Sequence, residues 1–187
     1  DLARSSNILI ENYRPGRMEE MGLGPDVLFA ENPNLIIVRV SGFGQTGPYR
    51  NKPGFGSLIE AMSGFATRNG FDDREPVLPP LALADMIAGM QGAYSVMVAL
   101  REVELGHRAG QIIDHSLLEP MFSVLGPEPG VYAVTGNRKT RSGSGSNTSS
   151  PRNVYKTSDG HWLALSASIQ TMAERLFRTI GRDDLNH

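Results

Sequence analysis

Short apolar runs alternate with helix-like segments along the first two thirds of the chain. The runs are residues 8–10, 35–40 and 111–114. The run 35–40 is rich in β-branched residues and almost continuously apolar, which is typical of a strand covered on both faces of a sheet. Helices are predicted from Pro25 to about Asn32, from Gly56 to Ala66, from near Asp85 to about Leu105, and from Ser116 onward. Strands that alternate with helices indicate an α/β layer with parallel strands.

A glycine-rich loop, residues 41–55, follows the strand predicted over 35–40. Because α/β proteins bind ligands at the carboxyl ends of their strands, this loop is a candidate ligand site. Its glycine spacing matches neither a phosphate-binding P-loop nor the GxGxxG turn of dinucleotide-binding proteins. A surface crossover loop with no ligand is the alternative.

The composition changes sharply near residue 135. Residues 136–150 contain no core-forming side chain, so we expect a linker or a mobile loop. Cations gather in and just after this segment: Arg138, Lys139, Arg141 and Arg152. We interpret them as part of a solvated loop rather than as an anion site.

A second compact region is predicted beyond this loop. Two strand-like runs, 153–156 and 162–165, flank a Ser-Asp-Gly turn and predict a β-hairpin, and a helix is predicted over about 170–180. We therefore expect three parts: residues 1–116 in a large α/β domain, 117–141 as a linker helix and loop, and 142–187 as the start of a smaller α+β domain.

Asp85 is a lone carboxylate in an apolar run of small residues, 81–100. The run is long enough to suggest a membrane span, but Asp85 and Gln91 lie inside it, so a buried helix of a soluble protein fits better. Asp85 is either a first-turn or N-cap acid stabilised by the helix dipole, or a nucleophile or base held at a helix start. The two interpretations are compatible, because a capping geometry also positions a nucleophile.

The overall composition narrows the classes of function. A net charge of −2 over 187 residues gives no general attraction to nucleic acid or to an anionic membrane. The absence of cysteine excludes disulfides, thiolate metal sites and a cysteine nucleophile, and no metal site is predicted. The absence of cysteine also fits a cytoplasmic protein, which we expect, and the N-terminus shows no signal-peptide pattern. The chain lacks an initiator methionine, and we expect it to be cut from a longer protein.

Four ordered segments carry a resemblance to a known family. They are residues 8–16 (ILIENYRPG) with 21–24 (MGLG), 41–48 (SGFGQTGP), 84–89 (ADMIAG) and 110–114 (GQIID). In type, order and spacing they resemble the class III CoA-transferases (the CaiB/BaiF family), whose relatives include formyl-CoA transferase, carnitine CoA-transferase and the α-methylacyl-CoA racemases. The resemblance covers essentially the whole chain, but family members are considerably longer. It implies a Rossmann-like large domain, a smaller α+β domain and an interlocked homodimer.

The resemblance also implies the chemistry. The family's nucleophilic aspartate matches Asp85, which would attack an acyl-CoA thioester to give a mixed anhydride and then an aspartyl-CoA thioester. An acceptor carboxylic acid would then receive CoA, so the substrates are an acyl-CoA and an acid, without a further cofactor. The CoA contacts implied are Asn12, Tyr13, Met21 and Phe55. The loop that shields the intermediate resembles Gly143, Ser144, Gly145 and Ser146.

Two alternatives remain open from the sequence. The racemase branch of the family has a histidine thirty residues before the aspartate, where this chain has Phe55. Phenylalanine cannot move a proton, which favours a transferase over a two-base racemase. The other alternative is an inactive fragment or an interaction module.

Overall fold

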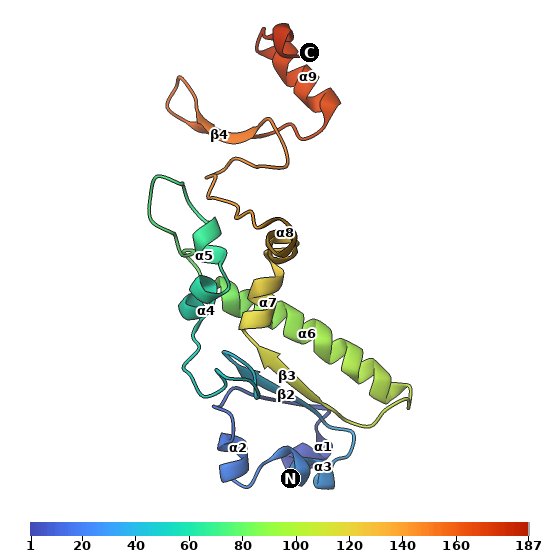
Figure 1. Ribbon diagram of the computed structural model, residues 1–187. Coiled ribbons are helices and arrows are strands. Elements are labelled where there is room, and N and C mark those ends of the chain that lie inside the picture. Colours follow the sequence, from blue (N-terminus) through green and yellow to red (C-terminus); the bar gives the residue numbers. More distant parts are fainter. Residues whose placement is uncertain (187) are drawn as a thin grey trace. The chain divides into compact units, whose positions relative to one another are not determined.

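The computed structural model describes residues 1–186. The helices and strands are α1 (Leu2–Ser5), β1 (Ile8–Glu11), α2 (Arg17–Glu20), α3 (Pro25–Glu31), β2 (Ile36–Ser41), α4 (Gly56–Met62), α5 (Phe65–Arg68), α6 (Leu83–Glu104), β3 (Ile112–Ser116), α7 (Leu118–Ser123), α8 (Glu128–Thr135), β4 (Arg152–Lys156), β5 (Trp162–Ser166), α9 (Gln170–Thr179) and the short 3₁₀ helix η1 (Asp183–Leu185) (Figure 1). They form two compact units: residues 1–66 with 78–137, and residues 67–77 with 138 and beyond.

A parallel three-stranded sheet in the order β1-β2-β3 is the framework of the first unit. Central strand β2 pairs Ile36 with Ile8 on one side and Ile37 with Ile112 on the other. The predicted α/β layer with parallel strands is therefore confirmed. Both edges of β2 are paired, and its residues from Ile36 to Arg39 are buried.

Apolar side chains of β2 alternate between the two faces of the sheet. One cluster contains Met18, Leu28, Leu35 and Ile37, and the other contains Ile36, Val38 and Ala99. The first joins the sheet to α2 and α3, and the second joins it to α6. Full burial of a single isoleucine of this kind contributes about 1.5–3 kcal/mol, so these two layers hold the sheet that supports the pocket described below.

A third cluster fixes the start of α6. Ile59 of α4, Ala84 of α6 and Met121 of α7 are completely buried against one another. Helix α4 follows β2, and α7 follows β3. The contacts of these two helices therefore hold the first turn of α6 near the carboxyl ends of both strands. This cluster determines where Asp85 lies.

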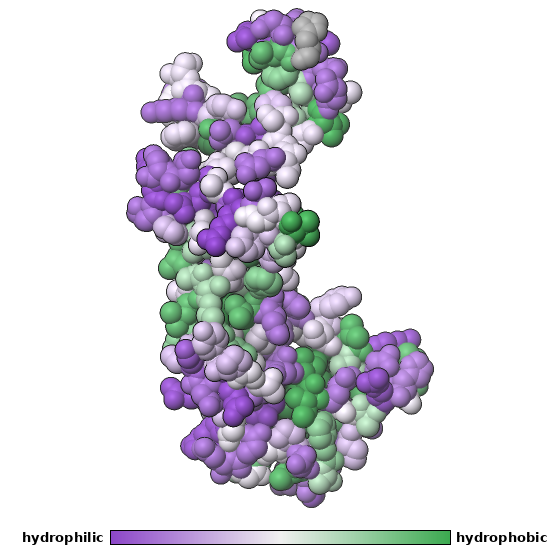
Figure 2. Space-filling view, in the orientation of Figure 1, coloured by the Kyte–Doolittle hydropathy of each residue, from purple (hydrophilic) through white to green (hydrophobic). Residues whose placement is uncertain are grey.

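Helix α6 is buried along one side only. Small residues form that side, namely Ala84, Ala88, Gly92 and Ala99, while Met86, Met90 and Tyr94 are exposed. Its length and composition alone would allow it to cross a membrane, a test that a helix packed on a sheet also passes. Figure 2 shows apolar surface where α6 lies beside β3. The expectation of a buried helix is thus correct for one face and wrong for the other.

The second unit contains the hairpin of β4 and β5 followed by α9, as predicted. The segment 67–77 packs with it through Arg141, which donates hydrogen bonds to the carbonyls of Phe71 at 2.8 Å and Arg74 at 2.7 Å. The loop interpretation was therefore incomplete, because Arg141 ties two segments together. Within the described chain, residues 137–150 form no helix or strand.

Local breaks account for the remaining differences from prediction. The helix expected over 56–66 is two helices, α4 and α5, because the chain turns at Gly64, whose φ of +93° favours glycine. The linker helix expected from Ser116 onward is likewise two helices, α7 and α8, and α8 contains Pro129 in its first turn. Residues 117–137 pack with the first unit, and residues 67–77 pack with the second. The expected division into domains at residues 116 and 141 stays a prediction.

Candidate active site

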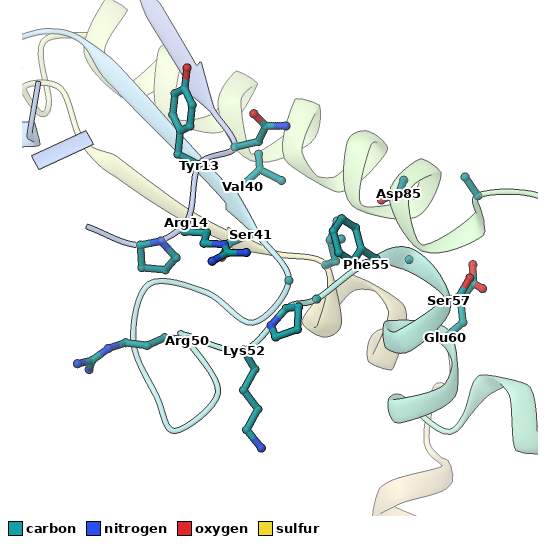
Figure 3. Close-up of a pocket in the computed structure, with 18 of the residues that line it drawn as sticks. Tyr13, Arg14, Val40, Ser41, Arg50, Lys52, Phe55, Ser57, Glu60 and Asp85 are labelled. Carbon is teal, nitrogen blue, oxygen red and sulfur yellow. The ribbon is translucent and has the colours of Figure 1, made fainter. Parts of the chain in front are cut away.

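A pocket of about 820 Å³ opens in the first unit beyond the carboxyl ends of β1 and β2 (Figure 3). Its walls come from the turn after β1, the glycine-rich loop after β2, the start of α4 and the first turn of α6. Loops that follow parallel strands supply the ligand sites of most α/β proteins. The pocket therefore agrees with the prediction that loop 41–55 contributes to a ligand site.

Asp85 lies on the pocket wall in the first turn of α6. It is the third residue of the helix, and its side chain is exposed. Ala82, the N-cap residue of α6, makes no side-chain hydrogen bond. A carboxylate at this position is stabilised by the helix dipole and open to a ligand. The two interpretations of Asp85 made from the sequence, a first-turn acid and an accessible nucleophile, are geometrically compatible.

Gly56, the first residue of α4, lies against the Asp85 carboxylate. A Cβ added to Gly56 would lie 3.0 Å from Asp85 Oδ2. Any other residue would therefore press on this oxygen. The start of α4 thus lies directly against the Asp85 carboxylate.

The turn with Asn12 and Tyr13 is held by a buried ionic network. Glu11 Oε2 accepts a hydrogen bond from the Tyr13 N–H at 2.7 Å, and Glu11 Oε1 accepts one from Arg39 Nε at 2.8 Å. Arg39 also donates to both carboxylate oxygens of Glu19, at 2.7 and 3.1 Å, and the hydrogen bond from Arg39 lowers the pKa of Glu19. The network connects the central strand to the pocket wall.

The glycine-rich loop is anchored at both ends. Asp114 of β3 accepts hydrogen bonds from the Gln45 N–H with both carboxylate oxygens, each at 3.0 Å. Gly42 and Gly54 touch through their backbones, since a Cβ on Gly42 would lie 2.4 Å from the Gly54 Cα. These contacts fold residues 42–54 into a closed wall and place Phe55 at its end, where the residue is 74% exposed.

Three cations line the pocket: Arg14, Arg50 and Lys52. In Figure 3, Arg14 lies beside Ser41 at the centre of the wall, whereas Arg50 and Lys52 extend outward from the loop. Lys52 Nζ lies 4.2 Å from the centre of the Tyr49 ring. Such a set gives an anion one cation inside the pocket and two at its rim.

The structure brings four of the predicted site residues together, Asn12, Tyr13, Phe55 and Asp85. Met21 follows α2, is 39% exposed and is not part of the lining, so its contact with CoA stays a prediction. The loop Gly143 to Ser146 belongs to the second unit, and its shielding role also stays a prediction.

Arg14, the rim cations and the buried Glu60 were not individually predicted as site residues. A signal was present for Arg14, which directly follows the Asn-Tyr pair in the segment 8–16, and for Arg50 and Lys52, which lie in the candidate loop 41–55. No such signal was present for Glu60.

Comparison with known proteins places this fold and pocket in one family. The profile of CoA-transferase family III matches residues 1–187. The chain belongs to CoA-transferase family III.

Relatives and solved structures agree with this placement. The succinyl-CoA–L-malate CoA-transferase alpha subunit of Chloroflexus aurantiacus is 43% identical over 185 residues, which cover 98% of this chain and 43% of the relative. The beta subunit from the same species is 41% identical over 192 residues, covering 99% of this chain and 46% of the relative. A CAIB/BAIF family protein from Brucella suis has a TM-score of 0.83 at 30% identity and covers 98% of this chain and 48% of that one. The chain thus spans less than half the length of these relatives.

Proposed function

We propose that the full protein is a CoA-transferase that moves CoA from an acyl-CoA to a carboxylic acid with Asp85 as the nucleophile. One observation carries the proposal: Asp85 is the accessible carboxylate in the first turn of α6, on the wall of a pocket shared with Asn12 and Tyr13. The family to which the chain belongs supports the same reaction class.

The proposed reaction has four steps. An Asp85 oxygen attacks the thioester carbonyl of the donor, the C–S bond breaks, and a mixed anhydride and CoA thiolate result. The thiolate attacks the aspartyl carbonyl and releases the donor acid, leaving an aspartyl-CoA thioester. The acceptor carboxylate attacks this thioester to form a second anhydride and thiolate. Finally the thiolate attacks the acceptor acyl carbon, which yields the new acyl-CoA and frees Asp85.

Charge in the pocket suits these substrates. Arg14 is placed to contact an anionic group within the pocket, and Arg50 and Lys52 are placed to contact phosphates or a carboxylate at the rim. Two relatives are named for succinyl-CoA and L-malate, so we propose dicarboxylic acids as the substrate class. CoA enters as a substrate, and we propose no resident cofactor, no nucleic-acid or membrane partner, and a cytoplasmic location.

We further propose a dimer. The chain is similar to both an alpha and a beta subunit of one transferase, at 43% and 41% identity. This favours an assembly of two related chains, and we propose the homodimer that the family resemblance implies. Sedimentation of the full protein separates a homodimer from an assembly that requires a second gene product.

The nucleophile is tested by trapping it. The full protein is incubated with succinyl-CoA, treated with hydroxylamine or borohydride, and digested for peptide mapping by mass spectrometry. The label is expected on Asp85, and Asp85→Asn is expected to carry none. Full activity in Asp85→Ala would overturn the assignment.

Racemisation of an acyl-CoA is the alternative activity to be tested. Phe55 lines the pocket near Asp85 and cannot act as an acid or base. With a 2-methylacyl-CoA in deuterated water, we expect exchange of CoA between acids without deuterium at the α-carbon. Rapid deuterium incorporation with inversion, and no exchange of CoA, would establish the racemase instead.

A further inference from the structure

Glu60 is a buried carboxylate on the pocket wall that the proposed reaction does not use. It lies on α4, is only 2% exposed, and lines the same pocket as Asp85. Burying a carboxylate is costly unless hydrogen bonds or an opposite charge compensate it. Within residues 1–186 no cationic side chain pairs with Glu60, and its partner is a backbone group.

That partner is the start of α6. Glu60 Oε1 accepts a hydrogen bond from the Ala84 N–H at 3.2 Å. Ala84 is the second residue of the helix, and the first N–H groups of a helix have no acceptor within it. Ala82, at the N-cap position, offers no side-chain oxygen. Glu60 therefore caps α6 from a neighbouring helix, where the helix dipole favours its negative charge.

The cap acts on the residue directly before Asp85. The same helix α4 touches Asp85 through Gly56, which leaves the space that the Asp85 carboxylate occupies. Gly56 and Glu60 are four positions apart and so share one face of α4. This face constrains both the backbone before Asp85 and its side chain. Figure 3 shows Glu60 on α4 and Asp85 on α6 in the same pocket.

We propose that Glu60 is a positioning residue for Asp85, an inference that rests on the proposed function. Without the Glu60 carboxylate, the Ala84 N–H has no acceptor and the first turn of α6 is held less firmly. The Asp85 carboxylate then spends less time in the geometry required for attack. Misplacement of a reacting group by about 1 Å can lower a rate by on the order of 100-fold. Acylation also neutralises Asp85, whereas Glu60 remains as the acceptor for the Ala84 N–H at the helix start.

The test compares two replacements in the full protein. Glu60→Gln keeps an oxygen acceptor at the same distance from the backbone, and Glu60→Ala removes it. The readouts are the single-turnover rate of Asp85 acylation by succinyl-CoA, followed by the trapped peptide, and the dissociation constant of free CoA. Glu104→Ala, at the far end of α6 and exposed, is the matched control.

We expect Glu60→Ala to slow acylation by about 10- to 100-fold with CoA affinity unchanged within about twofold. Glu60→Gln is expected to retain the wild-type rate within about threefold, and Glu104→Ala to match the wild type. If Glu60→Ala does not fold, Glu60→Asp, one methylene shorter, takes its place with the same expected loss.

Three other outcomes would overturn, in turn, the positioning role, the hydrogen bond as its cause, and the proposed function. A wild-type rate in Glu60→Ala overturns the positioning role and leaves the nucleophile intact. Equal losses in folded Glu60→Gln and Glu60→Ala overturn the hydrogen bond as the cause. Absence of the label in the wild type overturns the proposed function itself.

Discussion

Gly42 and Gly54 lie in direct backbone contact across the glycine-rich loop. A Cβ on Gly42 would lie 2.4 Å from the Gly54 Cα, and a Cβ on Gly54 would lie 2.6 Å from the Gly42 Cα. At both positions the nearest atom is backbone, which cannot move aside as the end of a side chain can. The contact closes the loop that forms the pocket wall and supports Phe55.

Gly42→Ala is therefore expected to destabilise the protein. Forcing a methyl group into a packed site costs about 1–3 kcal/mol, and here the obstacle is backbone. Urea unfolding of the full protein measures the change. Gly130→Ala in α8, where an added Cβ meets nothing within 4 Å, is the control and is expected to be neutral or slightly stabilising. Equal stability of the two variants would contradict the contact.

Gly56→Ala is expected to lower activity with little effect on stability. Its methyl group would press on Asp85 Oδ2 at 3.0 Å, whereas alanine itself is favourable in a helix. We expect a loss in kcat of about 10- to 100-fold and a free energy of unfolding unchanged within about 1 kcal/mol. Steady-state kinetics beside a urea curve checks both. Wild-type kcat would show that Asp85 can move away without consequence.

Arg39→Met tests the buried network under the Asn12–Tyr13 turn. Removing the cation leaves the buried carboxylate of Glu11 without its partner, at a cost of about 3–5 kcal/mol. Adding Glu11→Gln to Arg39→Met removes that buried charge and is expected to recover part of the loss. Thermal and urea unfolding measure the recovery. No recovery in the double variant would show that lost packing, not unpaired charge, dominates.

Glu19 predicts a pH dependence of stability. The hydrogen bond from Arg39 lowers the pKa of Glu19 in the folded protein. The ionised Glu19 therefore contributes its full share to the free energy of unfolding above the unfolded-state pKa of about 4.3, and this share is lost as the pH falls through the folded-state pKa. The stability advantage of the wild type over Glu19→Gln should therefore be constant from pH 7 to 5 and shrink below about pH 4. Urea unfolding at several pH values measures it. An advantage that grows on acidification would reverse the sign and contradict the ion pair.

Arg14→Gln is expected to weaken substrate binding. Arg14 lies within the pocket, so its loss should raise the KM for acyl-CoA or for the acid by about tenfold while kcat changes little. Arg101→Gln, in the last turn of α6, is the control. Because the Arg14 side chain is exposed, the increase in KM should diminish at high salt. An unchanged KM for both substrates would remove Arg14 from the binding site.

Local patterns in the sequence were sufficient for much of the fold. The β-branched run at 35–40 predicted a strand buried on both faces, and the Ser-Asp-Gly turn predicted the hairpin, because both depend on near neighbours. Gly64, by contrast, divides a helix at a point where periodicity continues. The exposed side of α6 could not be foreseen from hydrophobicity alone.

The site was predictable only where a motif carried it. Asp85, Asn12 and Tyr13 were identified through short segments of characteristic sequence. Glu60 was missed because its meaning depends on the Ala84 N–H, 24 residues away, and nothing in the sequence around it indicates that partner. The same holds for the contact between Gly42 and Gly54, which exists only in the folded backbone.

The bond between Asp114 and Gln45 joins positions 69 residues apart. Strand β3 must therefore reach its place beside β2 before the loop that walls the pocket is anchored. Contacts of such large sequence separation form late, since the intervening chain must first be closed. We infer that the pocket is among the last parts of the first unit to form and among the first to be lost on partial unfolding. Loss of activity should then precede loss of helical signal during denaturation.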